Sequence, residues 1–305
     1  MRIGLNGGAR SVERMIEQAQ RAEAEGFATL WYPSAVAGDP VTPMAMAGQA
    51  TTSIELGTSV LQTYTSHPVL QANRIAAASW SMGRPGFTLG VGPSHRPVIE
   101  GMFGMSYDTA GRHTEEYVRI LTALLRGEPV DVTGEELSLH GIPAPAIPHP
   151  VPVLVAALGP RLLRVAGAVA DGTILWMGNA RAVETHVVPH LAKAAADAGR
   201  GTPRIVAGLP VAVHDDVDEA RATAGRQFAN YGLLPNYQRI LAHGGVAGPA
   251  EAAIVGDEAS VAAQLQGLID AGATDVWAAI FPVGDDTSGS RRRTRDLLCE
   301  LATAT

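Results

Sequence analysis

The chain has 305 residues, 46% of them hydrophobic, which is enough to bury one large α/β core or two small ones. Its net charge of −7 argues against nucleic acid as the main partner, and a single cysteine, Cys299, excludes an internal disulfide and disfavours a cysteine-based zinc site. Neither a signal peptide nor a run approaching ~20 apolar residues is found, so we expect a cytoplasmic protein without a membrane partner.

Short apolar runs alternate with helical patterns along the whole chain. The predicted strands are residues 2–6, 28–32, 54–61, 87–92, 153–157, 173–176, 205–213 and 276–281. The predicted helices are residues 11–25, 43–50, 67–80, 114–125, 160–170, 182–198, 217–231, 260–271 and 291–301. Strands that alternate with helices pair in parallel, and eight such units in ~300 residues fit a (β/α)₈ TIM barrel. A doubly wound sheet is the alternative, although it would usually have fewer strands.

We therefore predict one barrel domain over residues 1–305, with insertions after strands four and seven. The first insertion, residues 128–151, is rich in proline and contains a possible hairpin. The second, residues 233–256, contains loops and room for a short helix. Long insertions in a barrel often cover the mouth of the active site, so we expect these two to do so.

The turn between the fifth strand and its helix consists of small residues. It comprises Ala156, Ala157, Leu158, Gly159 and Pro160. A helix start presents unpaired N–H groups and partial positive charge, and small residues let an anion reach them. The turn therefore predicts a phosphate-bearing ligand. An ordinary strand-to-helix turn, with Pro160 at the first helical position, is the alternative.

Several segments resemble one known family. Strand three, Gly57-Thr58-Ser59-Val60-Leu61, resembles the third strand of the luciferase-like barrel oxidoreductases, and it is closest to the branch that uses the deazaflavin coenzyme F420. Residues 87–95, FTLGVGPSH, resemble the family's strand-four signature, and residues 156–172 resemble its phosphate-binding turn and helix. The closing SRRRTRDLL resembles its last helix. The resemblance spans essentially the whole chain.

The resemblance implies a cofactor site with named residues. It implies a bulge and a non-proline cis peptide at Ser59–Val60, with Val60 behind the deazaflavin ring; a plain core valine is the alternative. It places Gly92, Pro93 and Ser94 against the cofactor, and the phosphate of the cofactor tail at the 156–160 turn. Thr63 either bonds the edge of the ring or simply ends the strand.

His95 is the predicted catalytic residue, as a general acid, because it ends the strand-four motif at the expected mouth. It could instead contact only the edge of the cofactor. Glucose-6-phosphate dehydrogenases of the same branch carry an acidic residue at the similar position, so this histidine argues against a sugar phosphate as substrate.

The substrate pocket is expected to be mostly apolar. Asn6 either contacts the substrate or caps its turn. Strand two ends in Leu30-Trp31-Tyr32-Pro33-Ser34-Ala35, where the sugar-phosphate enzymes carry an Asp-His pair. We predict that Trp31, Tyr32 and Ser34 line the pocket, although aromatic residues at strand ends are often core residues.

Three other motifs are interpreted as structural. His186 and His190 have the i, i+4 spacing of metal ligands, but Pro189 interrupts them and no acidic residue completes a set, so we predict no metal site. The arginines at 291–293 fit an exposed helix start, with a contact to an anionic cofactor tail as the second interpretation. The Gly90-Val-Gly92 segment lacks the third glycine of a dinucleotide-binding loop.

The predicted protein is an F420-dependent oxidoreductase that transfers a hydride between deazaflavin C5 and a small apolar organic substrate. The first alternative is an FMN-dependent two-component monooxygenase on the same fold. The second is a barrel that binds a cofactor or an assembly partner without catalysis, because fold does not dictate function. The family resemblance also implies a homodimer.

Overall fold

The computed structural model describes the whole chain except residues 9, 35–37 and 305. Within the described residues, eight parallel strands close into a TIM barrel, because β9 pairs with β10 and β12 pairs with β1. In chain order the barrel strands are β1 (Ile3–Asn6), β2 (Thr29–Tyr32), the interrupted strand β3 (Glu55–Thr58) with β4 (Leu61–Gln62), β5 (Phe87–Gly92), β8 (Val153–Val155), β9 (Gly172–Trp176), β10 (Arg204–Val213) and β12 (Asp275–Ile280). The predicted barrel is confirmed.

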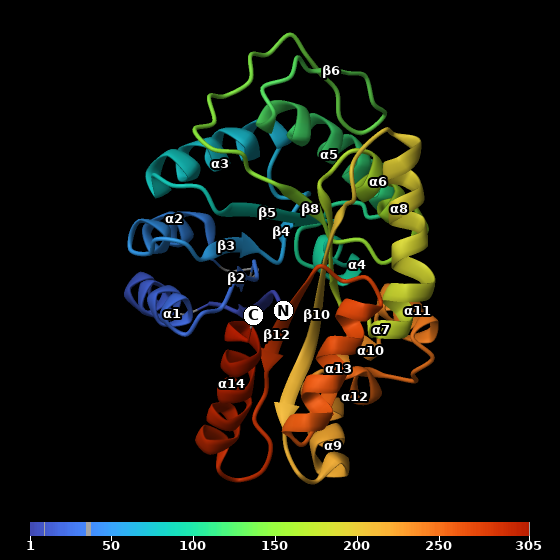
Figure 1. Ribbon diagram of the computed structural model, residues 1–305. Coiled ribbons are helices and arrows are strands. Elements are labelled where there is room, and N and C mark those ends of the chain that lie inside the picture. The colour runs from blue at the N-terminus through green and yellow to red at the C-terminus, as the bar shows by residue number, and fades with distance from the viewer. Residues whose placement is uncertain (9, 35–37, 305) are drawn as a thin grey trace.

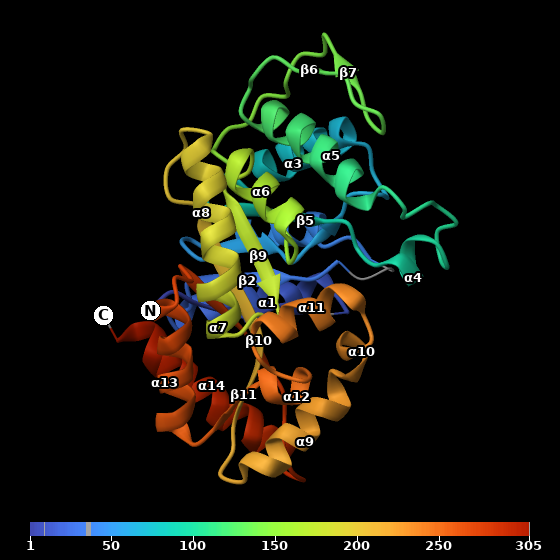
Figure 2. The ribbon, with the colours of Figure 1, turned by 90° about the vertical axis from the view of Figure 1, so that its right-hand side faces the viewer.

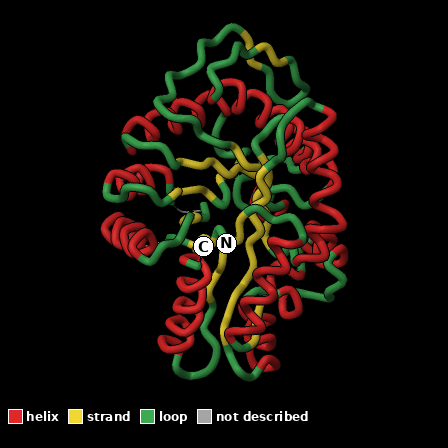
Figure 3. The backbone as a smooth tube through the Cα atoms, viewed as in Figure 1, coloured by secondary structure: helices red, strands yellow, loops and turns green. Residues whose placement is uncertain are grey.

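Helices surround the strands on the outside (Figures 1 and 3). They are α1 (Val12–Ala24), α2 (Val41–Gln49), α3 (Pro68–Met82), α5 (Ala110–Leu125), α6 (Pro160–Ala168), α7 (Ala180–Ala182) with the π-helix η1 (Val183–Val187) and α8 (Val188–Asp197), α13 (Glu258–Asp270) and α14 (Thr287–Thr303). Local sequence sets their ends: the Ser11 side chain caps α1, and α3 has Pro68 in its first turn and ends at the left-handed Gly83.

The third barrel strand is interrupted where the sequence predicts one continuous strand over residues 54–61. The peptide bond between Ser59 and Val60 is cis, as the family resemblance implies, and the strand resumes as β4. The Thr58 hydroxyl donates to the carbonyl of Gly90 (2.8 Å) and accepts from its N–H (2.9 Å). The side chain of Thr58 thus pairs the backbone of β5 across the interruption.

The two predicted insertions occupy different places. Residues 128–151 contain the expected hairpin, β6 (Asp131–Val132) with β7 (Leu139–His140), and extend over α3 and α5 at the top of Figure 1. The Trp80 indole N–H donates to the carbonyl of Ala146 (3.0 Å) and ties this segment to α3. The expectation that it covers the active-site mouth is wrong, because it follows α5 and none of its residues lines the cavity described below.

The second insertion is more regular than the sequence predicts. Residues 233–256 contain α11 (Pro235–His243), α12 (Pro249–Ala252) and the short strand β11 (Ile254–Gly256). The helix predicted over residues 217–231 is divided into α9 (Val217–Gln227) and α10 (Ala229–Gly232). β11 pairs in parallel with the far end of β10. The sequence also gave no sign of α4 (Arg96–Ile99), which begins directly after His95. In Figure 2, α4 and the α10–α11 pair lie on the same side of the barrel.

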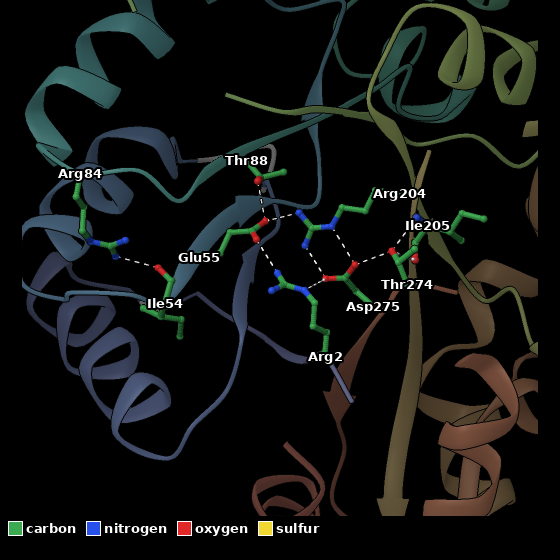
Figure 4. A network of polar contacts seen from close by, with 9 residues as sticks. All are labelled: Arg2, Ile54, Glu55, Arg84, Thr88, Arg204, Ile205, Thr274 and Asp275. Atoms are coloured by element: carbon green, nitrogen blue, oxygen red, sulfur yellow. Dashed lines mark hydrogen bonds and ion pairs between the residues drawn. The ribbon is translucent and has the colours of Figure 1, made fainter. Parts of the chain in front are cut away.

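The base of the barrel holds a charged network (Figure 4). The Arg204 guanidinium contacts Asp275 (2.6 and 2.9 Å) and Glu55 (2.6 Å). Arg2 bridges the same two carboxylates at 2.7 Å each. Above this network, Arg204 lies 5.5 Å from the ring of Trp31, which belongs to an inner apolar cluster with Ile174 and Trp277. Ion pairs therefore fill the base of the barrel, and a layer of apolar side chains follows in the interior.

Glu23 fixes the turn that leads into β3. Its carboxylate accepts the N–H groups of Thr52, Ser53 and Ile54 at 2.6–3.0 Å. Burial opposes ionisation, but these hydrogen bonds outweigh it and lower the pKa of Glu23 to about 2.

We expect Glu23→Ala to lower the free energy of unfolding by about 1–3 kcal/mol, because it leaves these N–H groups without their charged acceptor. Since the folded pKa is depressed, the stabilisation is complete above the unfolded pKa of ~4.3 and is lost as the pH falls toward 2. Urea unfolding at several pH values measures this. Glu17→Ala, an exposed position on the same helix, is the control, and equal effects of the two substitutions would contradict the assignment.

Candidate active site

A cavity of about 1580 Å³ opens at the carboxyl ends of the barrel strands. It is bounded by the ends of β1, β4, β5, β8, β9 and β12, by residues between 93 and 111, and by α10 and α11. Pockets for a single drug-sized ligand are about 300–1,000 Å³, so this one has room for a cofactor and a second molecule. The carboxyl end is also where barrel enzymes place their sites.

Most of the predicted site residues line this cavity, although they come from distant parts of the sequence. They are Asn6, Ser34, Ser59, Val60, Gly92, Pro93, Ser94, His95, Ala156, Leu158, Gly159 and Pro160. Ala35, which completes the strand-two motif, lies outside the described residues.

Four predicted residues do not line the cavity. Trp31 points into the barrel interior beneath it, and Tyr32 packs between strands and helices, because successive side chains of β2 face opposite sides. Ala157 is fully buried. Thr63 is buried as well, and its N–H donates to the carbonyl of Gly92 (3.0 Å), which fits the role of ending the strand. We therefore withdraw these four as direct ligand contacts.

Ser59 and Val60 form one wall of the cavity. A methyl group at Gly92 would lie 2.7 Å from Cβ of Ala156 and 3.1 Å from Cγ2 of Val60, so glycine lets three strands approach closely here. The Ser59 hydroxyl is buried and has no hydrogen-bond partner among the described residues. Gln62, which the sequence analysis missed, adds a side-chain amide to the same wall.

The N-terminus of α6 opens into the same cavity. Gly159 is its N-cap, and no side chain caps the first turn. A methyl group at Gly159 would meet nothing within 4 Å, so the turn is open toward the cavity. Arg161 in this first turn also lines the cavity and is paired with Glu115 (3.1 Å). These features suit an anion.

His95 lies at the N-cap of α4 and packs against Tyr237, with 5.6 Å between the ring centroids. Burial lowers the pKa of His95, so the neutral imidazole predominates at pH 7. The preceding Ser94 has a left-handed backbone (φ 61°), and the Tyr107 hydroxyl donates to its carbonyl at 2.7 Å. Burial raises the pKa of Tyr107 to about 12, which keeps this donor protonated.

An aromatic wall also lines the cavity and was not anticipated from the sequence. Trp176 is at its centre, stacked on Trp277 (5.0 Å) and meeting Phe228 (5.9 Å) and Tyr231 (5.7 Å) edge-on. The available signal was the spacing of aromatic residues at 228, 231 and 237. This spacing alone did not predict a role in the cavity, because nothing in the sequence placed α10 and α11 over the barrel.

Two further properties can be stated for the part of the chain that the structure describes. It contains no cluster of three or more His, Cys, Asp or Glu side chains able to hold a metal ion. None of its helices combines the length and apolar character needed to cross a membrane.

Residues 2–288 match the family model described as luciferase-like monooxygenase, and the chain belongs to that family. An uncharacterized protein of Mycobacterium tuberculosis is 30% identical over 258 residues, covering 79% of this chain and 75% of that one. An F420-dependent hydroxymycolic acid dehydrogenase of the same organism is 31% identical over 240 residues, covering 69% of this chain and 62% of that one.

Solved structures agree on the fold. The F420-dependent tetrahydromethanopterin reductase of Methanopyrus kandleri superposes with a TM-score of 0.77 at 20% identity, covering 98% of this chain and 97% of that one. The oxygenating constituent of a 3,6-diketocamphane monooxygenase from Pseudomonas putida, in complex with FMN, has a TM-score of 0.72 at 16% identity, covering 99% and 97%. At these identities the likeness concerns the fold alone. One of these two structures is named as F420-dependent, and the other is a complex with FMN.

Proposed function

We propose that this protein is an F420-dependent oxidoreductase that transfers a hydride between deazaflavin C5 and an apolar organic substrate. The observation that carries the proposal is a convergence: the Ser59–Val60 wall, the uncapped start of α6 and His95 all face one cavity. Relatives named as F420-dependent enzymes, at 30–31% identity, support the choice of cofactor.

The residues present fit such a cofactor. Val60 would support the ring from behind, and Gln62 would bring a polar side chain to its edge. The N–H groups at the start of α6 would hold the tail phosphate. When bound, the cofactor accepts or donates the hydride, while the protein contributes binding and orientation.

The aromatic wall and His95 would have different roles toward the substrate, the first in binding and the second in proton transfer. Trp176, Phe228 and Tyr231 offer an apolar surface that excludes water from the reacting carbon. His95, neutral at pH 7, would take the proton of a substrate hydroxyl during oxidation and return it during reduction. The sequence predicts His95 as a general acid. Because the neutral imidazole predominates, we propose that His95 acts as the base in oxidation and as the acid in reduction.

The FMN-dependent monooxygenase remains the second candidate, because an FMN-bound monooxygenase shares the fold. Turnover separates the two. We expect absorbance changes of F420 with a panel of apolar secondary alcohols, ketones and enones. Oxygen consumption with reduced FMN, and no F420 turnover with any of them, would favour the alternative. A homodimer also remains a proposal, and sedimentation velocity tests it.

Gly159→Glu should weaken binding of the phosphorylated cofactor at least tenfold, about 1.4 kcal/mol or more, because it places a carboxylate at the proposed phosphate site. The backbone at Gly159 is extended (φ −103°) and its surroundings are open, so the fold should tolerate the change. Calorimetric titration measures the loss. Gly159→Gln, of equal size and no charge, should lose much less, and equal affinity of parent and Gly159→Glu would remove the turn from the site.

A further inference from the structure

His186 lies outside the cavity but directly behind the 156–160 turn. Its side chain is buried, with 2% of the residue exposed, and its Nε2 lies 2.9 Å from the carbonyl oxygen of Leu158. A carbonyl only accepts hydrogen bonds, so Nε2 carries the proton and donates it. This contact joins the π-helix η1 to the turn that the proposed function assigns to the phosphate.

The contact determines where the next N–H group points. The peptide bond between Leu158 and Gly159 is trans, and in a planar trans peptide the C=O and N–H groups point in opposite directions. Holding the Leu158 carbonyl toward His186 therefore directs the N–H of Gly159 away from His186. Both Leu158 and Gly159 line the cavity, whereas His186 does not.

The imidazole of His186 is itself held firmly. His243, the last residue of α11, stacks on it with 3.8 Å between centroids and 10° between planes. The His190 ring lies 4.9 Å away, and its Nδ1 donates to the carbonyl of His186 (2.8 Å). Burial, together with these two neighbours, lowers the pKa of His186 and keeps it neutral. His186 and His190 thus each bond a backbone oxygen, and His243 stacks on His186. Among the described residues, these rings form no group that could hold a metal ion.

The sequence explains why His186 sits in a π-helix. Pro189 has no N–H to bond the carbonyl four residues earlier, and its ring clashes with that carbonyl. The helix widens to π geometry over Val183–Val187, and Pro189 is the second residue of α8, which follows. π turns occur often at functional sites. The His-Val-Val-Pro-His motif therefore encodes a local distortion rather than a metal site.

We propose that His186 is a positioning residue for the cofactor-tail phosphate: by bonding the Leu158 carbonyl, it aims the N–H of Gly159 into the cavity. The inference rests on the proposed function, because the turn holds a phosphate only if the cavity takes a phosphorylated cofactor. His186 does not touch the ligand and acts through the orientation of one peptide plane.

The test compares ligands that differ at the phosphate, namely F420 against its phosphate-free deazaflavin and FMN against riboflavin. For the pair that the parent binds, the ratio of the two dissociation constants measures the contribution of the phosphate. His186→Phe keeps a ring against His243 and removes the donor. We expect this ratio to fall about tenfold, with affinity for the phosphate-free ligand changed less than about twofold.

His186→Gln, which retains a donor of similar reach, should restore most of the ratio. His190→Phe, which keeps a ring beside His186 and leaves the His186 donor in place, should change the ratio much less than His186→Phe does. If His186→Phe does not fold, His186→Asn, whose amide is too short, is compared with His186→Gln. An unchanged ratio in a folded His186→Phe or His186→Asn, or an equal loss in His190→Phe, would overturn the inference alone. The inference would also be overturned if the parent bound each phosphate-free ligand as tightly as its phosphorylated counterpart. A parent that binds none would overturn the proposed function and, with it, this inference.

Discussion

Arg204→Met should lower the free energy of unfolding by about 3–5 kcal/mol, which is the usual consequence of removing one partner from a buried charged network. Asp275 is 1% exposed, and Glu55 shares the same guanidinium. Arg2 remains in the variant, but it is about half exposed and cannot replace the bidentate contact of Arg204. Denaturant unfolding followed by circular dichroism measures the loss.

The matched control is Arg119→Met. Arg119 pairs with Glu115 at the surface of α5 (3.1 Å) and is about half exposed, so its removal should cost less than about 1 kcal/mol. A loss below 1 kcal/mol for Arg204→Met, or losses of equal size for the two variants, would show that the network does not support the barrel base.

Because of the same network, the difference in free energy of unfolding between the parent and Arg204→Met should depend on pH. Burial opposes ionisation of Asp275, but Arg204 and Arg2 outweigh it and lower its pKa. A depressed pKa contributes stability above the unfolded value of ~3.9 that is lost as the pH falls through the folded value. The difference in free energy of unfolding between the two proteins should therefore become smaller in acid.

His95→Gln and His95→Ala should each lower kcat by about 10²-fold while changing cofactor affinity little, because proton transfer by a positioned side chain is worth roughly 10²–10⁴-fold. His95 lines the cavity and is held by the Ser94 turn and Tyr237. Steady-state kinetics at saturating cofactor, with cofactor affinity measured separately, test this.

The pH profile identifies the role of His95. Its pKa lies below 6.5, so the rate of alcohol oxidation should fall as the pH drops through that pKa and should be level above it. This limb should be missing in His95→Gln. An intact kcat with weaker cofactor binding would make His95 a cofactor contact, and a variant equal to the parent in both would exclude it from the reaction.

The sequence was most informative about strands and the turns that follow them. Apolar runs such as residues 205–213 predicted the barrel strands, and the small residues at 156–160 predicted an open turn, because both depend on local chemistry. The cis bond at Ser59–Val60 was different: no residue type there dictates the isomer, and only the family resemblance implied it.

The sequence did not predict the direction of side chains or the position of long insertions. Trp31 and Tyr32 were assigned to the pocket by their place near a strand end, but in β2 one faces the barrel interior and the other faces the helices. The packing of α11 over the mouth depends on contacts far apart in sequence, such as His243 on His186. Neither periodicity nor composition reports such contacts.

Titration of the purified protein with F420 and with FMN tests the central proposal most directly. We predict that F420 binds in the micromolar range or more tightly, that FMN binds more weakly, and that Gly159→Glu weakens the binding of F420 at least tenfold. Tighter binding of FMN than of F420, or the absence of binding by both, would contradict the proposed function.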